Sequence, residues 1–117
     1  MSPLMEKLAG MGCDMNAAWN RFLHDADFFE QCFRKLLDDP VFEALGSAIQ
    51  EHDKEAGFEY SHMLKGIIAT VGLTPMYQEI EAIVEPLRAG QEAGVQEAYG
   101  RLMSKREQFL KLLEEER

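Results

Sequence analysis

Residues 53–75 read DKEAGFEYSHMLKGIIATVGLTP, and this stretch decides the fold class of the chain. Asp53 is suited to begin a helix, because its carboxylate can accept a hydrogen bond from an unpaired amide of the first turn. Gly72 is suited to end it, since glycine readily adopts the left-handed conformation that terminates many helices. Large apolar side chains recur between them at the spacing of an amphipathic helix, at Tyr60, Leu64, Ile67 and Val71. We therefore predict a helix over residues 54–71 that buries these side chains.

The remainder of the chain also favours helices. No segment shows the sustained alternation of a half-buried strand, and most glycine and proline residues lie between segments of helical period. Short loops between long amphipathic helices favour antiparallel neighbours, so we expect an all-α fold, namely an antiparallel four-helix bundle with one or two short N-terminal capping helices. The expected bundle helices are residues 27–52 with a bend at Pro40, 54–71, 75–89 with a bend or early end at Pro86, and 92–115, and the short helices are 4–9 and 15–23.

The size and composition are those of one globular domain. The chain has 117 residues, of which 46% are apolar and 28% charged, which is ordinary for a soluble folded protein. We expect a single domain over residues 1–117, with an N-terminal extension or short helix at 1–11, a core at 12–113 and a solvated tail at 114–117. Since no obvious second apolar face remains, we expect a monomer.

The charge balance and the ends of the chain limit the partners and the location. There are 21 acidic and 12 basic side chains, and the formal net charge of -9 repels nucleic acid and anionic membranes. No stretch approaches the roughly 20 apolar residues that cross a bilayer, and the N-terminus lacks the apolar segment of a secretion signal. Cys13 and Cys32 form no CxxC pair, which is typical of reduced thiols. We therefore expect a cytoplasmic protein whose partner is another protein.

His62 lies on the opposite face of the predicted helix 54–71 from the apolar stripe. A free histidine has a pKa of about 6.5, so an exposed imidazole is mostly neutral in the cytoplasm and offers a nitrogen lone pair to an electrophile. At about 100° per residue, the same face of the helix carries Phe58, Glu59, Lys65, Gly66 and Ala69. The pattern predicts a docking surface with a nucleophile at its centre.

The residues that follow His62 suit one electrophile in particular, a phosphoryl group. Phosphorylation adds roughly two negative charges, which Lys65, one turn further along the helix, can partly neutralise. An in-line transfer also needs the donor to approach closely, and the small residues Gly66 and Ala69 leave room for a partner protein. In the middle of a helix Gly66 costs about 1 kcal/mol relative to alanine, so a role in clearance would explain its presence.

The sequence also resembles a known family at these positions. The pattern His62-x-Leu64-Lys65-Gly66, followed by Gly72 and by a helix that opens at Thr74-Pro75, is similar to the signature of histidine-containing phosphotransfer (HPt) domains. The resemblance extends over residues 12–113 and includes Gly12-Cys13-Asp14, Arg21-Phe22-Leu23 and Asp39-Pro40. Ser61, Ile67, Ile68 and Thr70 depart from the residues that are common in the family.

The resemblance implies a phosphorelay carrier. By this analogy His62 accepts a phosphoryl group on Nε2 from the aspartyl phosphate of a receiver domain and passes it to the aspartate of another receiver, while Lys65 supports the phosphate and Gly66 gives clearance. The partners implied are receiver domains of response regulators or a hybrid histidine kinase. No cofactor is expected on this chain, because the Mg²⁺ required would belong to the receiver. We expect no ATP site on this chain and no turnover of a small molecule, so whether it counts as an enzyme stays open.

Two other interpretations remain at this point. The first is a helical adaptor that binds a kinase or receiver without accepting phosphate, with Phe58, Glu59 and Ala69 as docking residues; a carboxylate at Glu59, one turn from His62, opposes an added phosphate but can meet a basic residue of a partner. The second is a metal-binding bundle, because Glu59-x-x-His62 has the spacing of a ligand pair in di-metal bundles. That second interpretation requires His62 to point inward and a second such pair, which the sequence lacks.

Overall fold

The computed structural model of this chain describes residues 1–116, and that range is all-helical. The long helix predicted from the sequence is present at the predicted residues, and short connections separate most of the others. The helices are α1 (Pro3–Gly10), α2 (Met15–Arg21), α3 (Ala26–Leu37), α4 (Val41–Gln50), α5 (Lys54–Val71), α6 (Thr74–Arg88) and α7 (Val95–Glu115).

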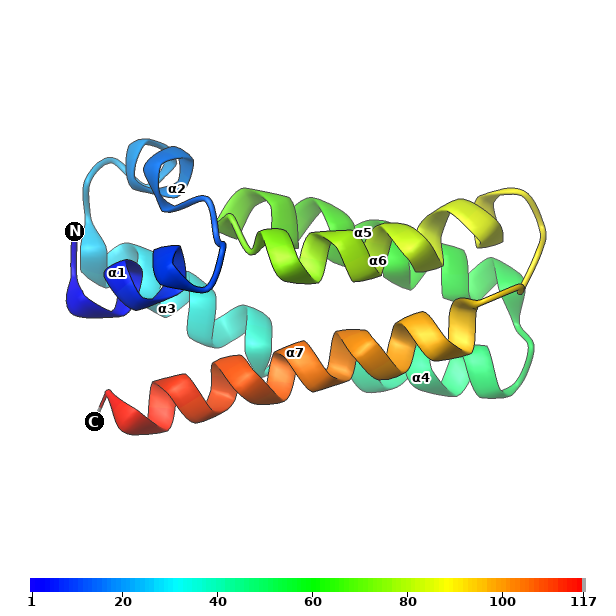
Figure 1. The fold of residues 1–117 in the computed structure, drawn as a ribbon. Helices are drawn as coiled ribbons and strands as arrows, with labels where there is room; N and C mark the ends of the chain where they lie inside the picture. Colours follow the sequence, from blue (N-terminus) through cyan, green and yellow to red (C-terminus); the bar gives the residue numbers. More distant parts are fainter. Residues whose placement is uncertain (117) are drawn as a thin grey trace.

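The longer helices pack side by side with alternating chain direction (Figure 1). Helix α5 contacts both α4 and α6, and α7 contacts both α6 and α4, so each of these four helices touches two of the others. Helices α1 and α2 lie at the end of the molecule where the C-terminus is found, and α3 connects that end to α4 (Figure 1). This arrangement leaves one side of α5 uncovered along the middle of the molecule.

Both ends of α5 form as the sequence predicted. The carboxylate of Asp53 accepts a hydrogen bond from the Ala56 amide at 3.1 Å. Gly72 has a φ of 80°, in the left-handed region, and a Cβ at this position would lie 2.7 Å from the backbone oxygen of Asp14. The Gly72 carbonyl accepts a hydrogen bond from the Asp14 amide at 2.9 Å. The end of α5 is therefore held against the start of α2.

The predicted bent helix over residues 27–52 is wrong, because α3 and α4 are separate helices. The chain turns at residues 38–40, where the Asp39 carboxylate accepts a hydrogen bond from the Val41 amide at 2.9 Å. Pro40 has no amide hydrogen to continue the helix. Pro86, in contrast, does not end a helix. It lies within α6, which continues to Arg88, so the expected early end at this proline does not occur.

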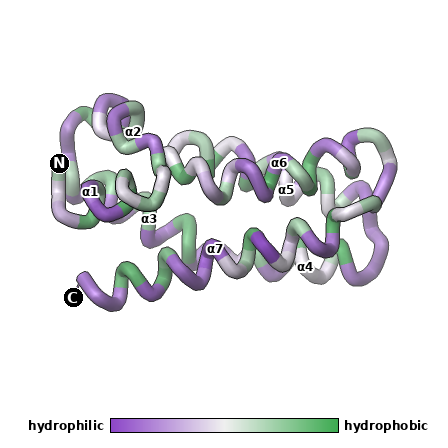
Figure 2. Tube along the Cα trace, viewed as in Figure 1, coloured by the Kyte–Doolittle hydropathy of each residue, from purple (hydrophilic) through white to green (hydrophobic). Residues whose placement is uncertain are grey.

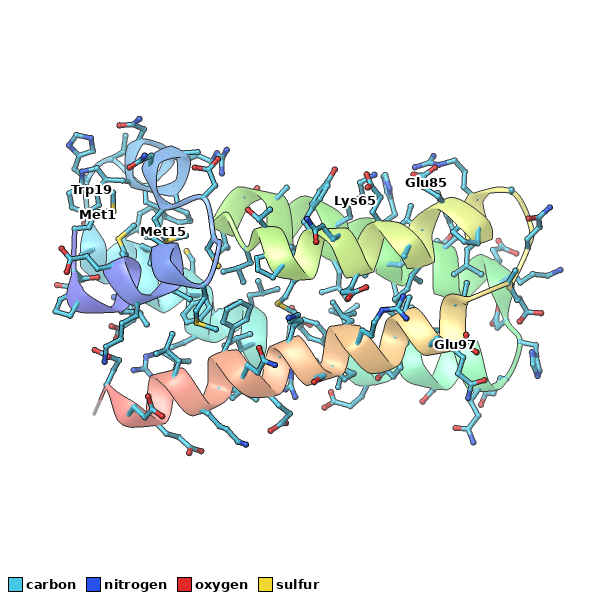
Figure 3. The ribbon with its side chains drawn as sticks, viewed as in Figure 1. Met1, Met15, Trp19, Lys65, Glu85 and Glu97 are labelled. Atoms are coloured by element: carbon cyan, nitrogen blue, oxygen red, sulfur yellow. The ribbon has the colours of Figure 1, made fainter. Side chains whose placement is uncertain are left out.

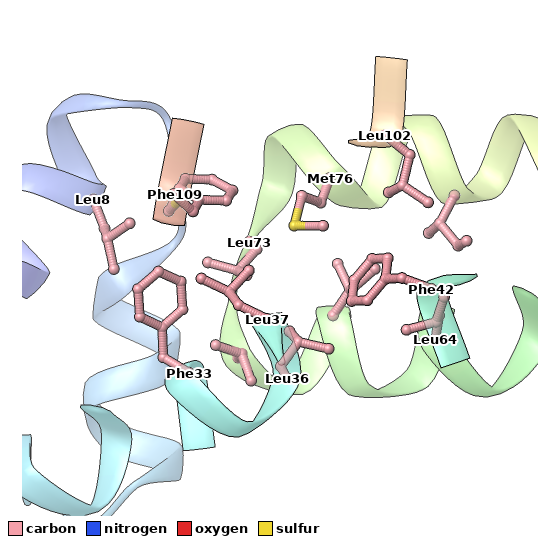
Figure 4. Close-up of a cluster of buried hydrophobic side chains, with 14 of the residues drawn as sticks. Leu8, Phe33, Leu36, Leu37, Phe42, Leu64, Leu73, Met76, Leu102 and Phe109 are labelled. Carbon is pink, nitrogen blue, oxygen red and sulfur yellow. The ribbon is translucent and has the colours of Figure 1, made fainter. Parts of the chain in front are cut away.

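The core draws on every helix, including the N-terminal one. Leu4, Met5 and Leu8 of α1 are buried in the same cluster as the residues of the longer helices. Figure 4 shows Leu8 beside Phe33 and Phe109, which come from α3 and α7. Residues 1–11, expected to be an extension or a short helix, thus form a helix that contributes to the core.

The C-terminal segment is also tied to the N-terminal helix. Glu116 of the predicted solvated tail forms an ion pair with Lys7, which raises the pKa of the Lys7 ammonium, whereas Glu114 and Glu115 are exposed and Arg117 lies outside the described residues. Along α7, hydrophilic and hydrophobic positions alternate in bands (Figure 2), as expected for a helix with one buried face. Within residues 1–116, no helix combines the length and apolarity that crossing a bilayer requires.

The buried face of α5 is rotated relative to the prediction. Ser61 and Ile68 are fully buried, whereas Tyr60 and Ile67, which were expected in the core, are only half-buried. The shift is about 50° around the helix at 100° per residue. Ser61 tolerates burial because its hydroxyl donates a hydrogen bond to the Gly57 carbonyl at 2.7 Å. His62 remains on the uncovered side after this correction.

Candidate functional site

His62 is exposed in the middle of α5. No hydrogen bond to its ring nitrogens is formed within residues 1–116. The other histidines differ, because His24 Nε2 lies 3.0 Å from the Asn20 amide oxygen and His52 Nδ1 lies 3.0 Å from the Glu92 carboxylate. Of the three imidazoles, the one predicted to react is thus the one whose nitrogens are both left to solvent or to a partner.

The His62 ring is stacked on Phe58, one turn earlier in α5. The ring centroids are 5.4 Å apart and the planes are inclined by 13°, which is the geometry of an offset stack. The guanidinium carbon of Arg88, from α6, lies 5.1 Å from the centroid of the Phe58 ring. Phe58 is half-buried, so its predicted role in docking a partner would use only the part that these contacts leave exposed.

Lys65 is turned toward α6. Its ammonium nitrogen lies 3.5 Å from a Glu85 carboxylate oxygen and 3.9 Å from one of Glu81. It also lies 5.7 Å from the centroid of the Tyr77 ring. The Lys65 side chain is only 21% exposed, because it lies against α6. Figure 3 shows Lys65 and Glu85 on the same side of the adjacent helices α5 and α6.

The small residues of the predicted site face open space. Gly66 is exposed, and a Cβ built on it would meet no atom within 4 Å apart from its own local backbone. Ala69 is exposed as well, and its carbonyl accepts a hydrogen bond from the Arg21 guanidinium at 3.0 Å. No packing contact in residues 1–116 therefore requires a glycine at position 66.

Glu59 is exposed on the same side of α5, and it forms no ion pair with His62 in the part of the chain that is described. Glu59 and His62 are both exposed. This counts against the metal interpretation, because di-metal bundles need both members of the ligand pair to point into the bundle. No cluster of three or more histidine, cysteine, aspartate or glutamate side chains that could hold a metal ion occurs among residues 1–116.

Helix α6 contributes to this site, which the sequence did not predict. Glu81, Glu85 and Arg88 lie on exposed positions of α6 and contact residues of α5 that carry the predicted chemistry. Their spacing of three and four residues was a signal that they share one face of a helix. That spacing alone did not indicate which neighbouring helix the face would meet.

The fold and the site together define a class: an all-helical protein with a solvent-facing histidine on one of its long helices. Comparison of the chain with protein-family models, with curated proteins and with solved structures gave no match.

Proposed function

We propose that this chain is a phosphorelay carrier of the HPt type, in which His62 accepts and donates a phosphoryl group. Helices α4 to α7, with α3 leading into α4, would be its four-helix bundle. One observation carries the proposal: both ring nitrogens of the exposed His62 imidazole lack a partner within residues 1–116. The open space at the neighbouring Gly66 supports it.

The proposed reaction exchanges one bond to phosphorus for another. A lone pair on the neutral imidazole attacks the phosphorus of an aspartyl phosphate, so a nitrogen–phosphorus bond forms while the acyl oxygen–phosphorus bond breaks. The receiver's aspartate leaves as a carboxylate with the bonding electrons. The second ring nitrogen of His62 keeps its proton or releases it to water, and the reverse sequence passes the group to the next receiver.

Lys65 has to exchange partners in this scheme. In the unphosphorylated protein its ammonium is shared between Glu81 and Glu85 at 3.9 and 3.5 Å. A phosphoryl group on His62, one turn away on the same helix, would compete with these carboxylates for it. Both carboxylates are about half exposed to solvent, which screens the ion pairs, and pairs of this kind contribute only about 0.2–1 kcal/mol each. A phosphate of roughly two negative charges is therefore a stronger partner than either carboxylate.

The partners follow from the reaction. We propose that they are receiver domains of response regulators or of a hybrid histidine kinase, with the required Mg²⁺ bound on the receiver and no cofactor on this chain. The carrier would act as a monomer in the cytoplasm. Nucleic acid and anionic membranes are disfavoured by the net charge of -9.

A transfer experiment with histidine controls tests the proposal. Receivers carrying a radiolabelled aspartyl phosphate are incubated with the protein, and the label should appear on this chain in an acid-labile form. His62→Gln should abolish labelling, whereas the matched variants His24→Gln and His52→Gln should be labelled as the unmodified protein is. Labelling that persists in His62→Gln would overturn the assignment.

The adaptor remains a second candidate because of the ion pairs of Lys65. A lysine already held by Glu81 and Glu85 would serve a protein that binds a receiver without accepting phosphate. Stable binding of receivers across a panel, without any transfer of label to His62, would favour the adaptor over the carrier.

A further inference from the structure

A continuous series of contacts joins Lys65 to His62 through residues of α6. Lys65 pairs with Glu85 at 3.5 Å, and Glu85 pairs with Arg88 at 3.6 Å. Arg88 lies over the Phe58 ring at 5.1 Å, and that ring is stacked on His62 at 5.4 Å. The imidazole of His62 thus contacts the Phe58 ring, and that ring in turn contacts Arg88 of the neighbouring helix α6.

We propose that Phe58 and Arg88 are positioning residues for His62, with Phe58 setting the direction of the imidazole ring and Arg88 holding Phe58 in place. This inference rests on the proposed function, because it concerns how the reactive nitrogen is presented to a phosphorylated receiver. Neither residue touches the reacting atoms, and both act through the ring of His62.

His62 needs positioning residues because an exposed histidine side chain can adopt several rotamers. On a helix, the rotamer that points into the preceding turn is rare, which leaves two common χ1 wells, and χ2 is broad and roughly two-fold. About four ring directions are therefore open to an unrestrained side chain. In-line transfer requires the attacking nitrogen and the leaving oxygen to be aligned at about 3–3.5 Å. Stacking on Phe58, four residues earlier, fixes χ1 and the plane of the ring before the receiver arrives, and leaves only the two orientations related by a 180° rotation about χ2.

Arg88 gives this stack an anchor outside α5. A guanidinium over an aromatic face is attracted by the negative potential of the ring, and Arg88 is itself paired with Glu85 on the same helix. Because α5 and α6 pack closely, Phe58 is held between its own helix and the next one. Arg88 would therefore influence His62 only when the Phe58 ring is present.

The first part of the test measures the ring direction by NMR and needs no phosphate. The stacked Phe58 ring should shift the Hδ2 and Hε1 resonances of His62 upfield in the unmodified protein. Phe58→Leu should remove the shift, Phe58→Tyr should retain it, and Arg88→Gln should reduce it. Tyr60→Leu is the matched control, because Tyr60 is a half-buried aromatic of the same helix for which no stacking on His62 is seen among the described residues. A shift that survives in Phe58→Leu would overturn the proposal.

The second part measures transfer from a phosphorylated receiver over a range of receiver concentrations. If Phe58 acts by orienting the ring, Phe58→Leu should lower the maximal first-order rate constant by about twofold, since the number of populated directions rises from two to four. The half-saturating receiver concentration should stay the same. Phe58→Tyr should restore the rate. A change confined to the half-saturating concentration would overturn positioning and assign Phe58 to docking.

A double-mutant cycle decides the part played by Arg88. Arg88→Gln should slow transfer when Phe58 is present and should have no further effect in Phe58→Leu. If the double variant is slowed by the product of the two single effects, Arg88 does not act through the Phe58 ring. The proposed function can fail separately. If the unmodified protein and Tyr60→Leu accept no phosphate from any receiver, the carrier proposal fails, while the NMR comparison still decides whether Phe58 orients His62.

Discussion

Gly66 offers the sharpest test of the site, because α7 contains a matched control. Gly66 and Gly100 both lie inside long helices, both are exposed, and a Cβ at either would meet no atom within 4 Å apart from its own local backbone. Glycine inside a helix costs about 1 kcal/mol relative to alanine. Gly66→Ala and Gly100→Ala should therefore each raise the free energy of unfolding by about 1 kcal/mol, and raise Tm by roughly 4 °C in a chain of this size.

Substitutions at the two positions should have different effects on the rate of phosphotransfer. A leucine at position 66 adds a branch that extends about 4 Å from the backbone, over three bonds of roughly 1.5 Å. Reacting atoms must approach to about 3–3.5 Å, and a displacement of about 1 Å can reduce a rate about 100-fold. Gly66→Leu should thus slow transfer from a receiver at least about 100-fold, Gly66→Ala should slow it less, and Gly100→Leu should not change it.

Two measurements decide the outcome. Urea unfolding followed by circular dichroism gives the stability of each variant, and rapid-quench transfer from a labelled receiver gives the rate. Equal transfer rates for Gly66→Leu and Gly100→Leu would refute clearance as the reason for the glycine. If Gly66→Ala lowers stability while Gly100→Ala raises it, position 66 has a structural role instead.

Three further predictions concern the lysine, the helix end and the thiols. Lys65→Ala should shorten the lifetime of the acid-labile phosphate yet change the free energy of unfolding by less than about 1 kcal/mol; an unchanged lifetime would contradict its role. Gly72→Ala should destabilise the fold by at least about 1–2 kcal/mol in urea, because φ is 80° and the Cβ would lie 2.7 Å from a backbone oxygen. Burial raises the pKa of Cys13 to about 12, so iodoacetamide at pH 8 should modify the half-buried Cys32 first, as peptide mass mapping will show, and equal rates would count against this.

The same thiol has a consequence for stability at high pH. The pKa of Cys13 is raised from 9.0 to about 12, so the folded protein keeps a proton that the unfolded chain releases. The stabilising contribution of this group is complete below pH 9 and is lost as the pH rises toward 12. Cys13→Ala should make unfolding in urea less sensitive to pH over that interval.

Local signals account for the parts of the fold that were predicted well. The bounds of α5 follow from Asp53 and Gly72, whose capping interactions involve neighbours in the chain. The exposure of His62 follows from the same local periodicity. The split between α3 and α4 was within reach of the sequence too, because Pro40 can neither donate a hydrogen bond nor follow a helical residue easily.

The rotation of α5 about its axis was harder to predict from the sequence, because small residues of α5 make its close contact with α6. Gly57 is buried against α6, and a Cβ there would lie 3.1 Å from a methyl carbon of Leu87. Ser61, the next position on that face, is buried with its hydroxyl bonded to the Gly57 carbonyl. Hydrophobic periodicity gives no weight to a glycine or a serine, so it assigned Tyr60 and Ile67 to the core in their place.

Sequence alone determined that this chain is helical, where α5 begins and ends, and that His62 lies on the face away from the large apolar side chains. These properties depend on residues within a few positions of one another. Only the tertiary structure decided that Lys65 is shared by Glu81 and Glu85, and that Arg88 lies over the ring stacked on His62. Those contacts depend on the relative rotation and register of α5 and α6, which the packing of both helices against the whole core sets.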